Sequence, residues 1–433
     1  MKKQFIYIIT LLFACQIAQA QFKLSGEFKP RTEFRHGFGN LIPDAAEPGF
    51  GISTRVRLNS DYTFGAYELY VSLQDVAVWG ENRQILPFDQ NNSFAVFQAW
   101  AKINLGSGWS TKLGRQVLSY DDQRILGGLD WAQQGRNHDL GLFTYKSEKF
   151  KADFGFAWNQ DTQNPTGFDS VGNLYTITGF FSYKHMQYMH LNFKNKGLNG
   201  SLLVLNNGFQ DFTRDADGNI DSFGGISSLQ TFGAHLNYKL GDLGILFNGY
   251  LQTGDRQNEV DVKGAYLTSL DLNYKTSSVV NLGIGAEIIS GNDGEAGETG
   301  AFFPLYGTNH KFNGFMDYFY VGNHANSVGL IDLHASVKFN TSETSNLLIK
   351  VLNFSGEQET AGGEKSLGTE VDIVFAKKFK GFALAAGYSQ MFASDGLYEI
   401  RNITEDAAAD VQNWAWLQLV FKPNFFENFD PKE

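Results

Sequence analysis

The sequence predicts an all-β fold, a transmembrane antiparallel β-barrel of about eighteen strands, with sixteen strands as the next expectation. Three observations predict it. Apolar and polar residues alternate along many segments, aromatic residues make up 15% of the chain, and no stretch after residue 20 is apolar enough for a transmembrane helix. A membrane protein without such helices must pair its backbone groups in a closed barrel. The expected location is the outer membrane of a Gram-negative bacterium.

Residues 1–20 are typical of a cleavable signal peptide. Two lysines precede an apolar run from Phe5 to Ala14, and Ala18-Gln19-Ala20 supplies the small residues that a signal peptidase recognises. The apolar run is about half as long as a membrane-spanning helix. A lipidated Cys15 is the alternative interpretation. We expect one barrel domain over residues 21–433, without cysteine and therefore without disulfides.

Alternation with a period of two is the pattern of a barrel wall, because successive side chains of a strand point to opposite faces. It is clearest over residues 22–35, 231–240, 268–275 and 367–375. About nineteen candidate strands can be counted, and one is expected to be a loop because single-chain bacterial barrels have even strand numbers. The longer polar segments predict extracellular loops or segments folded into the lumen: 37–50, 81–92, 118–135, 160–173, 211–227, 291–326 and 393–410.

The charges are unevenly distributed. The formal net charge is −11, yet eight of the eleven arginines precede residue 140. Arg55 and Arg57 alternate with apolar neighbours, which predicts that both face the lumen, and the same alternation predicts Arg31 on the inner side of the first strand. Rings of basic side chains select anions in pores, and arginine forks suit carboxylates. The alternative is that these arginines only brace the wall, since Glu27 and Glu33 could neutralise them.

One stretch resembles a known family. Leu113-Gly114-Arg115-Gln116 leads into Gln123-Arg124, and Trp131, Gly135-Arg136 and Asp139 follow. This run resembles the alginate export family of outer-membrane barrels. Similar elements of that family are matched by Arg55-Val56-Arg57-Leu58 upstream and by Pro304-Leu305-Tyr306-Gly307 downstream. The resemblance is sharp over about residues 50–145 and moderate near 290–320, and elsewhere only the strand pattern agrees.

The resemblance implies an eighteen-stranded, monomeric barrel whose arginine-rich pore passes an alginate-like uronic-acid polymer or small anionic solutes. With the alternation argument, it gives the candidate anion-binding residues Arg31, Arg55, Arg57, Arg115, Arg124 and Arg136, with Asp122 and Asp139 as local partners. One feature departs from the family. The closing strand, 413–422, is followed by an eleven-residue tail instead of ending the chain on an aromatic residue.

No catalytic residue, metal site or cofactor is expected. His310 and His324, with Asp317 between them, are the one cluster that a hydrolase would use, and no serine motif accompanies them. The expected partners are outer-membrane lipid, an anionic glycan or carboxylate solute, and the barrel-assembly machinery during biogenesis, without nucleic acid. Two alternatives to an anion channel remain: a general unselective porin, and an adhesion or scaffold barrel with a plugged lumen.

Overall fold

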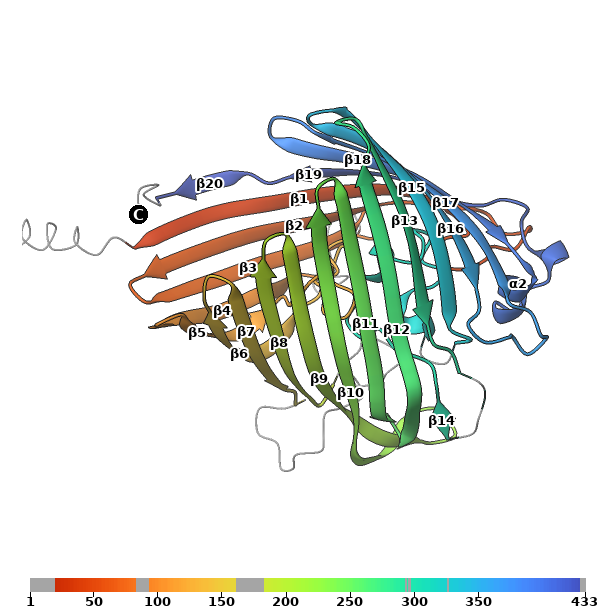
Figure 1. Ribbon diagram of the computed structural model, residues 1–433, viewed down its shortest axis with the longest axis horizontal. Helices are drawn as coiled ribbons and strands as arrows, with labels where there is room; N and C mark the ends of the chain where they lie inside the picture. Colours follow the sequence, from red (N-terminus) through yellow and green to blue (C-terminus); the bar gives the residue numbers. More distant parts are fainter. Residues whose placement is uncertain are drawn as a thin grey trace, which may run out of the picture.

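The computed structural model describes residues 20–82, 93–160, 183–292, 294, 297–324 and 327–428. Within them, eighteen long antiparallel strands form one closed barrel, and the last of these strands pairs back onto the first (Figure 1). The fold class predicted from the alternation is therefore confirmed, at the preferred strand number. The expected signal peptide lies outside the described residues, apart from Ala20.

The barrel strands are β1 (Gln21–His36), β2 (Gly49–Phe64), β3 (Tyr67–Val78), β4 (Ala95–Gly106), β5 (Trp109–Gln116), β6 (His138–Lys146), β7 (Phe150–Trp158), β8 (His185–Asn195), β9 (Leu198–Arg214), β10 (Ile220–Leu240), β11 (Leu243–Arg256), β12 (Val260–Lys275), β13 (Val280–Ile289), β15 (Leu330–Ser342), β16 (Ser345–Ser355), β17 (Ser366–Lys378), β18 (Phe382–Ala393) and β19 (Gln412–Phe421). The shorter elements are β14 (Glu298–Thr299), β20 (Asn424–Glu427), α2 (Asp395–Ile400), and the 3-10 turns η2 (Asn309–Lys311), η3 (Val321–His324) and η4 (Glu405–Ala407). No helix among these described segments is long and apolar enough to cross a membrane.

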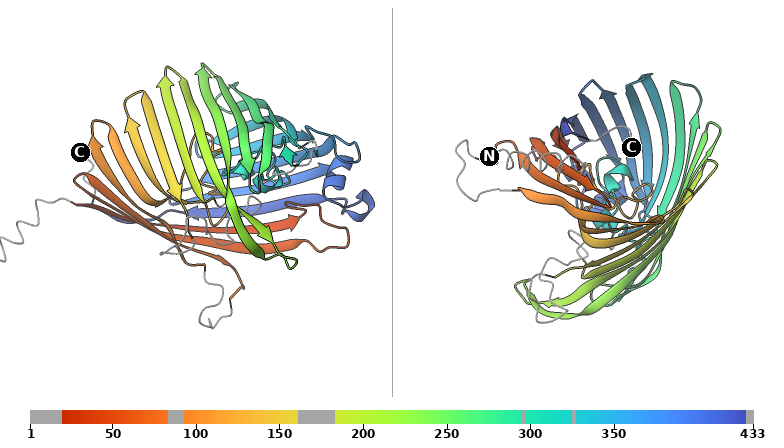
Figure 2. Two further views of the ribbon diagram at one scale, coloured as in Figure 1. Left: turned by 90° about the horizontal axis from the view of Figure 1, so that it is seen from below. Right: turned by 90° about the vertical axis from the view of Figure 1, so that its left-hand side faces the viewer.

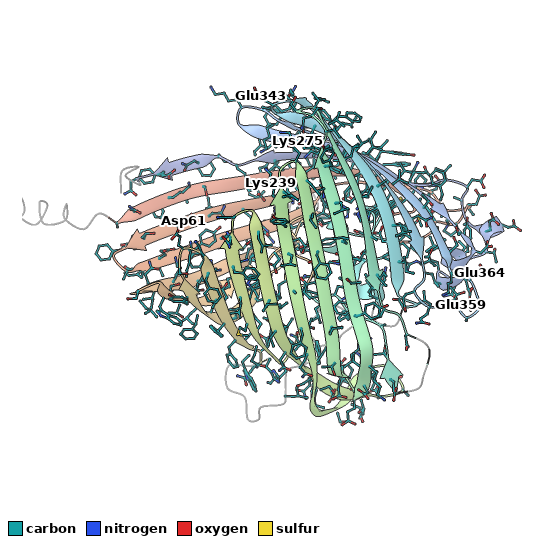
Figure 3. The ribbon with its side chains drawn as sticks, in the orientation of Figure 1. Asp61, Lys239, Lys275, Glu343, Glu359 and Glu364 are labelled. Atoms are coloured by element: carbon teal, nitrogen blue, oxygen red, sulfur yellow. The ribbon has the colours of Figure 1, made fainter. Side chains whose placement is uncertain are left out.

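Short turns join the strands at one end of the barrel, and long loops join them at the other. The two-residue turn between β8 and β9 has positive φ at Lys196 (34°) and Gly197 (86°), the conformation whose twist matches that of the paired strands. Bacterial barrels keep short turns in the periplasm and long loops outside. In Figure 3, Lys275 lies beside a short turn and therefore marks the periplasmic end of the barrel. Glu359 and Glu364 lie in a longer loop and mark the extracellular end.

The outer face of the barrel is apolar. On β7, Phe154 and Phe156 are exposed, whereas the residues between and beside them are buried. At the periplasmic rim, the ring of Phe421 lies 6.0 Å from Phe28 and 5.4 Å from Phe382, between centroids. Such a surface is unfavourable in water and favourable against lipid, and an aromatic girdle is typical of the membrane interface.

Some boundaries differ from those predicted. The predicted loop 211–227 is mostly strand, because β9 continues to Arg214 and β10 begins at Ile220. Its polar residues were misleading, since they bond across the hairpin: Ser227 Oγ donates to Asp211 Oδ1 over 2.8 Å. The C-terminal tail includes β20, which pairs with β1. The predicted loops 81–92 and 160–173 lie largely outside the described residues.

Two loops fold into the barrel instead of extending from it. They are residues 117–137, between β5 and β6, and residues 300–324, between β14 and β15, which the strands surround in the right-hand view of Figure 2. Hydrogen bonds join them: Gly127 N donates to the Tyr306 carbonyl (2.9 Å), and Thr308 N to the Gln123 carbonyl (2.9 Å). Much of the buried core of the molecule therefore lies in the lumen.

Candidate functional site

A line of basic side chains runs along the inner face of the first two strands. The register of β1 and β2 places Lys29 opposite Arg55 and Glu27 opposite Arg57, and residues directly opposite each other on one face of a sheet are close neighbours. We call this surface the cationic wall. Its cations are Lys29, Arg31, Arg35, Arg55 and Arg57, and the carboxylates of the two strands among them are Glu27 and Glu33. The wall therefore has an excess of positive charge.

A segment of the first inward loop, residues 130–134, lies against the cationic wall, and we call it the strap. Lys29 Nζ donates to its first carbonyl (2.5 Å), Arg31 Nη1 to its second (2.9 Å) and Arg55 Nη1 to its fourth (3.2 Å). In return, Gln133 Nε2 donates to the Lys29 carbonyl over 3.3 Å. The cations thus satisfy backbone carbonyls that burial would otherwise leave unpaired.

Two carboxylates complete this cluster. Glu27 Oε1 accepts hydrogen bonds from Arg55 Nε (2.8 Å) and Nη2 (2.5 Å). Asp130 Oδ1 accepts from Arg55 Nη2 (2.8 Å) and Arg57 Nη1 (3.3 Å). Partial burial acts to raise the pKa of Asp130, but the positive charges of Lys29, Arg55 and Arg57 outweigh it and hold this pKa below its ordinary value. Asp130 is therefore ionised at neutral pH.

Two cavities lie along the cationic wall, one on each side of the strap. The extracellular cavity, about 560 Å³, is lined in part by Arg31, Glu33, Arg35, Trp131, Asp317 and Tyr320. The periplasmic cavity, about 390 Å³, is lined in part by Lys23, Glu27, Arg57, Tyr70 and Lys422. Lys29 and Arg55 line neither cavity and, by their position in β1 and β2, lie between the two. The cluster around the strap thus lies between two open spaces.

Stacked rings line part of the extracellular cavity. The Trp131 ring stacks on His310, with centroids 4.2 Å apart and planes at 9°, and the Arg31 guanidinium lies 4.3 Å from the centre of the same tryptophan. His310 Nδ1 is 3.0 Å from Asp317 Oδ1. These contacts hold Trp131 between a cation and an imidazole. They fix the side of the strap that faces the extracellular cavity.

His324 has a different environment. Its Nε2 donates to the Phe319 carbonyl over 2.9 Å. Burial and the nearby charge of Arg124 lower the pKa of His324 to about 3, so its ring is neutral at neutral pH. The contacts of the two histidines thus differ: His310 packs in the wall of a cavity, and His324 closes a turn of its own loop.

Arg124 and Asp122 fasten the first inward loop to the wall opposite the strap. Arg124 Nε donates to Glu287 Oε2 on β13 (2.9 Å), and its Nη2 donates to Asn313 Oδ1 (2.9 Å) in the second inward loop. Asp122 Oδ2 accepts from Asn248 Nδ2 on β11 over 2.8 Å. All of these side chains are buried. Arg124, predicted as an anion-binding residue, and Asp122, predicted as its local partner, therefore anchor the loop to the wall.

The other predicted site residues, Arg115, Arg136 and Asp139, lie in two different places. Arg136 Nη1 donates to the Gly307 carbonyl over 3.3 Å and so links the two inward loops. Arg115 and Asp139 form a double hydrogen bond of 2.9 and 2.8 Å across β5 and β6. The chain neighbours of Asp139 on both sides are buried on the inner face, so this pair projects from the outer face. Arg115 was predicted from the family-like motif, and a motif does not show which face of the barrel a residue occupies.

Of the predicted residues, the structure brings Arg31, Arg55 and Arg57 together at one site. Asp130 was not predicted as a site residue, although it lies next to Trp131 in the motif that carried the resemblance. A carboxylate in a loop gives no pattern of its own, and its proximity to Arg55 depends on how the loop folds back into the barrel.

The fold is similar to that of several solved structures, although no protein-family model and no curated protein match the sequence. Solved structures match over nearly the whole chain: OccAB4 of Acinetobacter baumannii (TM-score 0.64, 14% identity, covering 94% of this chain and 98% of that one) and a BenF-like porin from Pseudomonas fluorescens Pf-5 (TM-score 0.61, 12% identity, 93% and 99%). The outer membrane protein opdK of Pseudomonas aeruginosa also matches (TM-score 0.59, 10% identity, 93% and 99%).

At such identities the likeness concerns the fold, which is that of outer-membrane porins. Together with the apolar outer face, it confirms the predicted location in the bacterial outer membrane. The resemblance to the alginate export family is unconfirmed, since the matching structures named here are of other porins.

Proposed function

We propose that this chain is an outer-membrane diffusion channel for small anionic solutes, carboxylates in particular, and that they pass along the cationic wall. One observation carries the proposal: the cavities on the two sides of the strap share a single line of basic side chains. Basic residues along a pore attract anions and repel cations, and their effect is strongest where the path is narrow and the local dielectric constant is low.

The interior favours small solutes over a uronic-acid polymer. The two inward loops are hydrogen-bonded to each other inside the lumen, which leaves separate cavities of about 560 and 390 Å³. Cavities of this size suit single small molecules. A polymer would need a continuous open path through the barrel. Passage of a small carboxylate would require only local movement of the strap, and no chemical step is proposed.

A plugged barrel is the second candidate function, and a specific observation favours it. Buried hydrogen bonds fasten the first inward loop at both ends, through Arg55 at the strap and through Arg124 at β13. If these contacts never open, the chain is a scaffold in the membrane and passes no solute.

Swelling of proteoliposomes distinguishes these functions. Vesicles containing the purified chain are diluted into isosmotic succinate, arabinose or lysine, and the rate of swelling reports solute entry. The proposal predicts faster entry of succinate than of the cation lysine, although both are small. Equal rates for all three solutes would indicate an unselective porin. Swelling no faster than that of protein-free vesicles would indicate a plugged barrel.

A further inference from the structure

Asp130 differs from the other groups around the strap because it combines a strong ionic contact with access to solvent. Its side chain is 68% exposed, whereas the side chains of Arg55 and Arg57, whose cations it bridges, are 0% and 10% exposed. A solvent-facing carboxylate therefore covers two buried guanidinium groups. Anionic solutes that enter the lumen would be attracted to the same two cations.

The carboxylate of Asp130 is not what holds the strap in place. Lys29, Arg31 and Arg55 bind backbone carbonyls of the strap, and Gln133 bonds back to the wall. Glu27, which is buried, supplies the permanent partner of Arg55. Removal of the Asp130 charge would leave all of these contacts in place.

The geometry at Asp130 also leaves donor capacity unused. A single oxygen, Oδ1, accepts from both arginines, at 2.8 and 3.3 Å. The buried Arg57 Nη2 has no hydrogen-bond partner among the described residues. A buried donor without a partner is costly, and a ligand that offers two oxygens could satisfy the two guanidinium groups more completely than Asp130 does.

We propose that the Arg55–Arg57 pair is a carboxylate-binding site between the two cavities, and that Asp130 occupies it as an internal competitor. A small mono- or dicarboxylate arriving from either cavity displaces the Asp130 side chain, binds both guanidinium groups, and leaves when Asp130 returns. This inference rests on the proposed function in one respect only, the passage of the solute. Binding at the site requires no passage.

Asp130→Asn tests the site because it keeps the shape of the side chain and removes its charge. With the competitor weakened, succinate should bind on the order of tenfold more tightly, the change expected when one charge-assisted hydrogen bond no longer competes. Asp139→Asn is the matched control, since it removes the same charge from the outer face. Arg57→Gln should weaken succinate binding, because it removes one of the two cations.

Two readouts separate this inference from the proposed function. Calorimetric titration of succinate into the detergent-solubilised barrel measures binding whether or not the barrel conducts. Conductance block in a planar bilayer measures binding during passage. Tighter succinate binding by Asp130→Asn, with unchanged binding by Asp139→Asn, supports the site. This holds even if the wild-type barrel proves to be closed. Unchanged or weaker succinate binding by that variant, with the barrel folded, would overturn the inference while leaving an anion channel possible.

Discussion

Arg124 and Glu287 are 163 residues apart in the chain and form a buried ion pair in the lumen, with Arg124 Nε donating to Glu287 Oε2 over 2.9 Å. Arg124 comes from an inward loop and Glu287 from β13 of the wall. Removal of one partner of such a pair leaves the other charge buried and unpaired, which is far more costly than loss of a surface ion pair. This pair therefore controls how firmly the inward loop is held.

Replacing Arg124 by alanine should loosen loop 117–137. The expected cost to the packing of this loop is about 3–5 kcal/mol, the range for a broken buried ion pair. We predict a larger and noisier single-channel conductance than that of the wild type, together with new protease cleavage within the loop. Arg115→Ala removes an arginine from the outer face and should change neither the single-channel conductance nor the protease cleavage of the loop. Identical traces for Arg124→Ala and wild type would mean that the ion pair does not restrain the loop.

Replacing Arg57 by glutamine should reduce the preference of the channel for anions, because Arg57 faces the periplasmic cavity and carries part of the charge excess of the wall. The reversal potential under a salt gradient measures this preference. Arg115→Gln makes the same change in net charge on the outer face, so its reversal potential should stay at the wild-type value. Equal shifts in both variants would show that overall charge, and not the cationic wall, sets the selectivity.

The contribution of Asp130 should depend on pH in a defined direction. The pKa of Asp130 is held below its ordinary value, so its ion pair is fully present above the ordinary carboxyl range and is lost only as the pH falls through the lowered pKa. The difference in selectivity between wild type and Asp130→Asn should therefore be constant from pH 8 to pH 5. Reversal potentials measured over this range check it, and a difference that fades near pH 6 would contradict the assigned charge state.

Deletion of residues 424–433 should leave the barrel able to insert and fold. The deletion removes β20, which pairs with β1, and the contact of Phe426 with Phe22, whose ring centroids are 6.1 Å apart. The eighteen barrel strands stay intact, so we expect a modest loss of about 1–3 kcal/mol from the lost apolar burial. The difference in electrophoretic mobility between unheated and heated samples measures the folded fraction. A deleted chain that never reaches the folded form would show that the tail is required for insertion and folding.

The fold could be predicted from the sequence because a barrel wall repeats one simple rule. Each strand alternates lipid-facing and lumen-facing residues, and this alternation correctly placed Arg31, Arg55 and Arg57 on the inner face. The rule failed at the polar hairpin 211–227, because hydrogen bonds between strands satisfy residues such as Asp211 that otherwise indicate a loop.

The site could be predicted only in part because its other half is a loop. The strap lies against the cationic wall through contacts between side chains and backbone carbonyls, and carbonyls leave no trace in a sequence. The family-like motif named Arg115, Arg124 and Arg136 together, yet they occupy the outer face, an anchor at β13 and the junction of two loops. Spacing along a chain does not give direction within a folded loop.

Single-channel recording of the purified chain in a planar bilayer, under a salt gradient and then with succinate added, tests the cationic path most directly. We predict an open channel whose reversal potential shows anion preference and whose current falls as succinate occupies the Arg55–Arg57 pair. A barrel that conducts cations in preference to anions and is indifferent to succinate would contradict the assignment of this wall as the solute path.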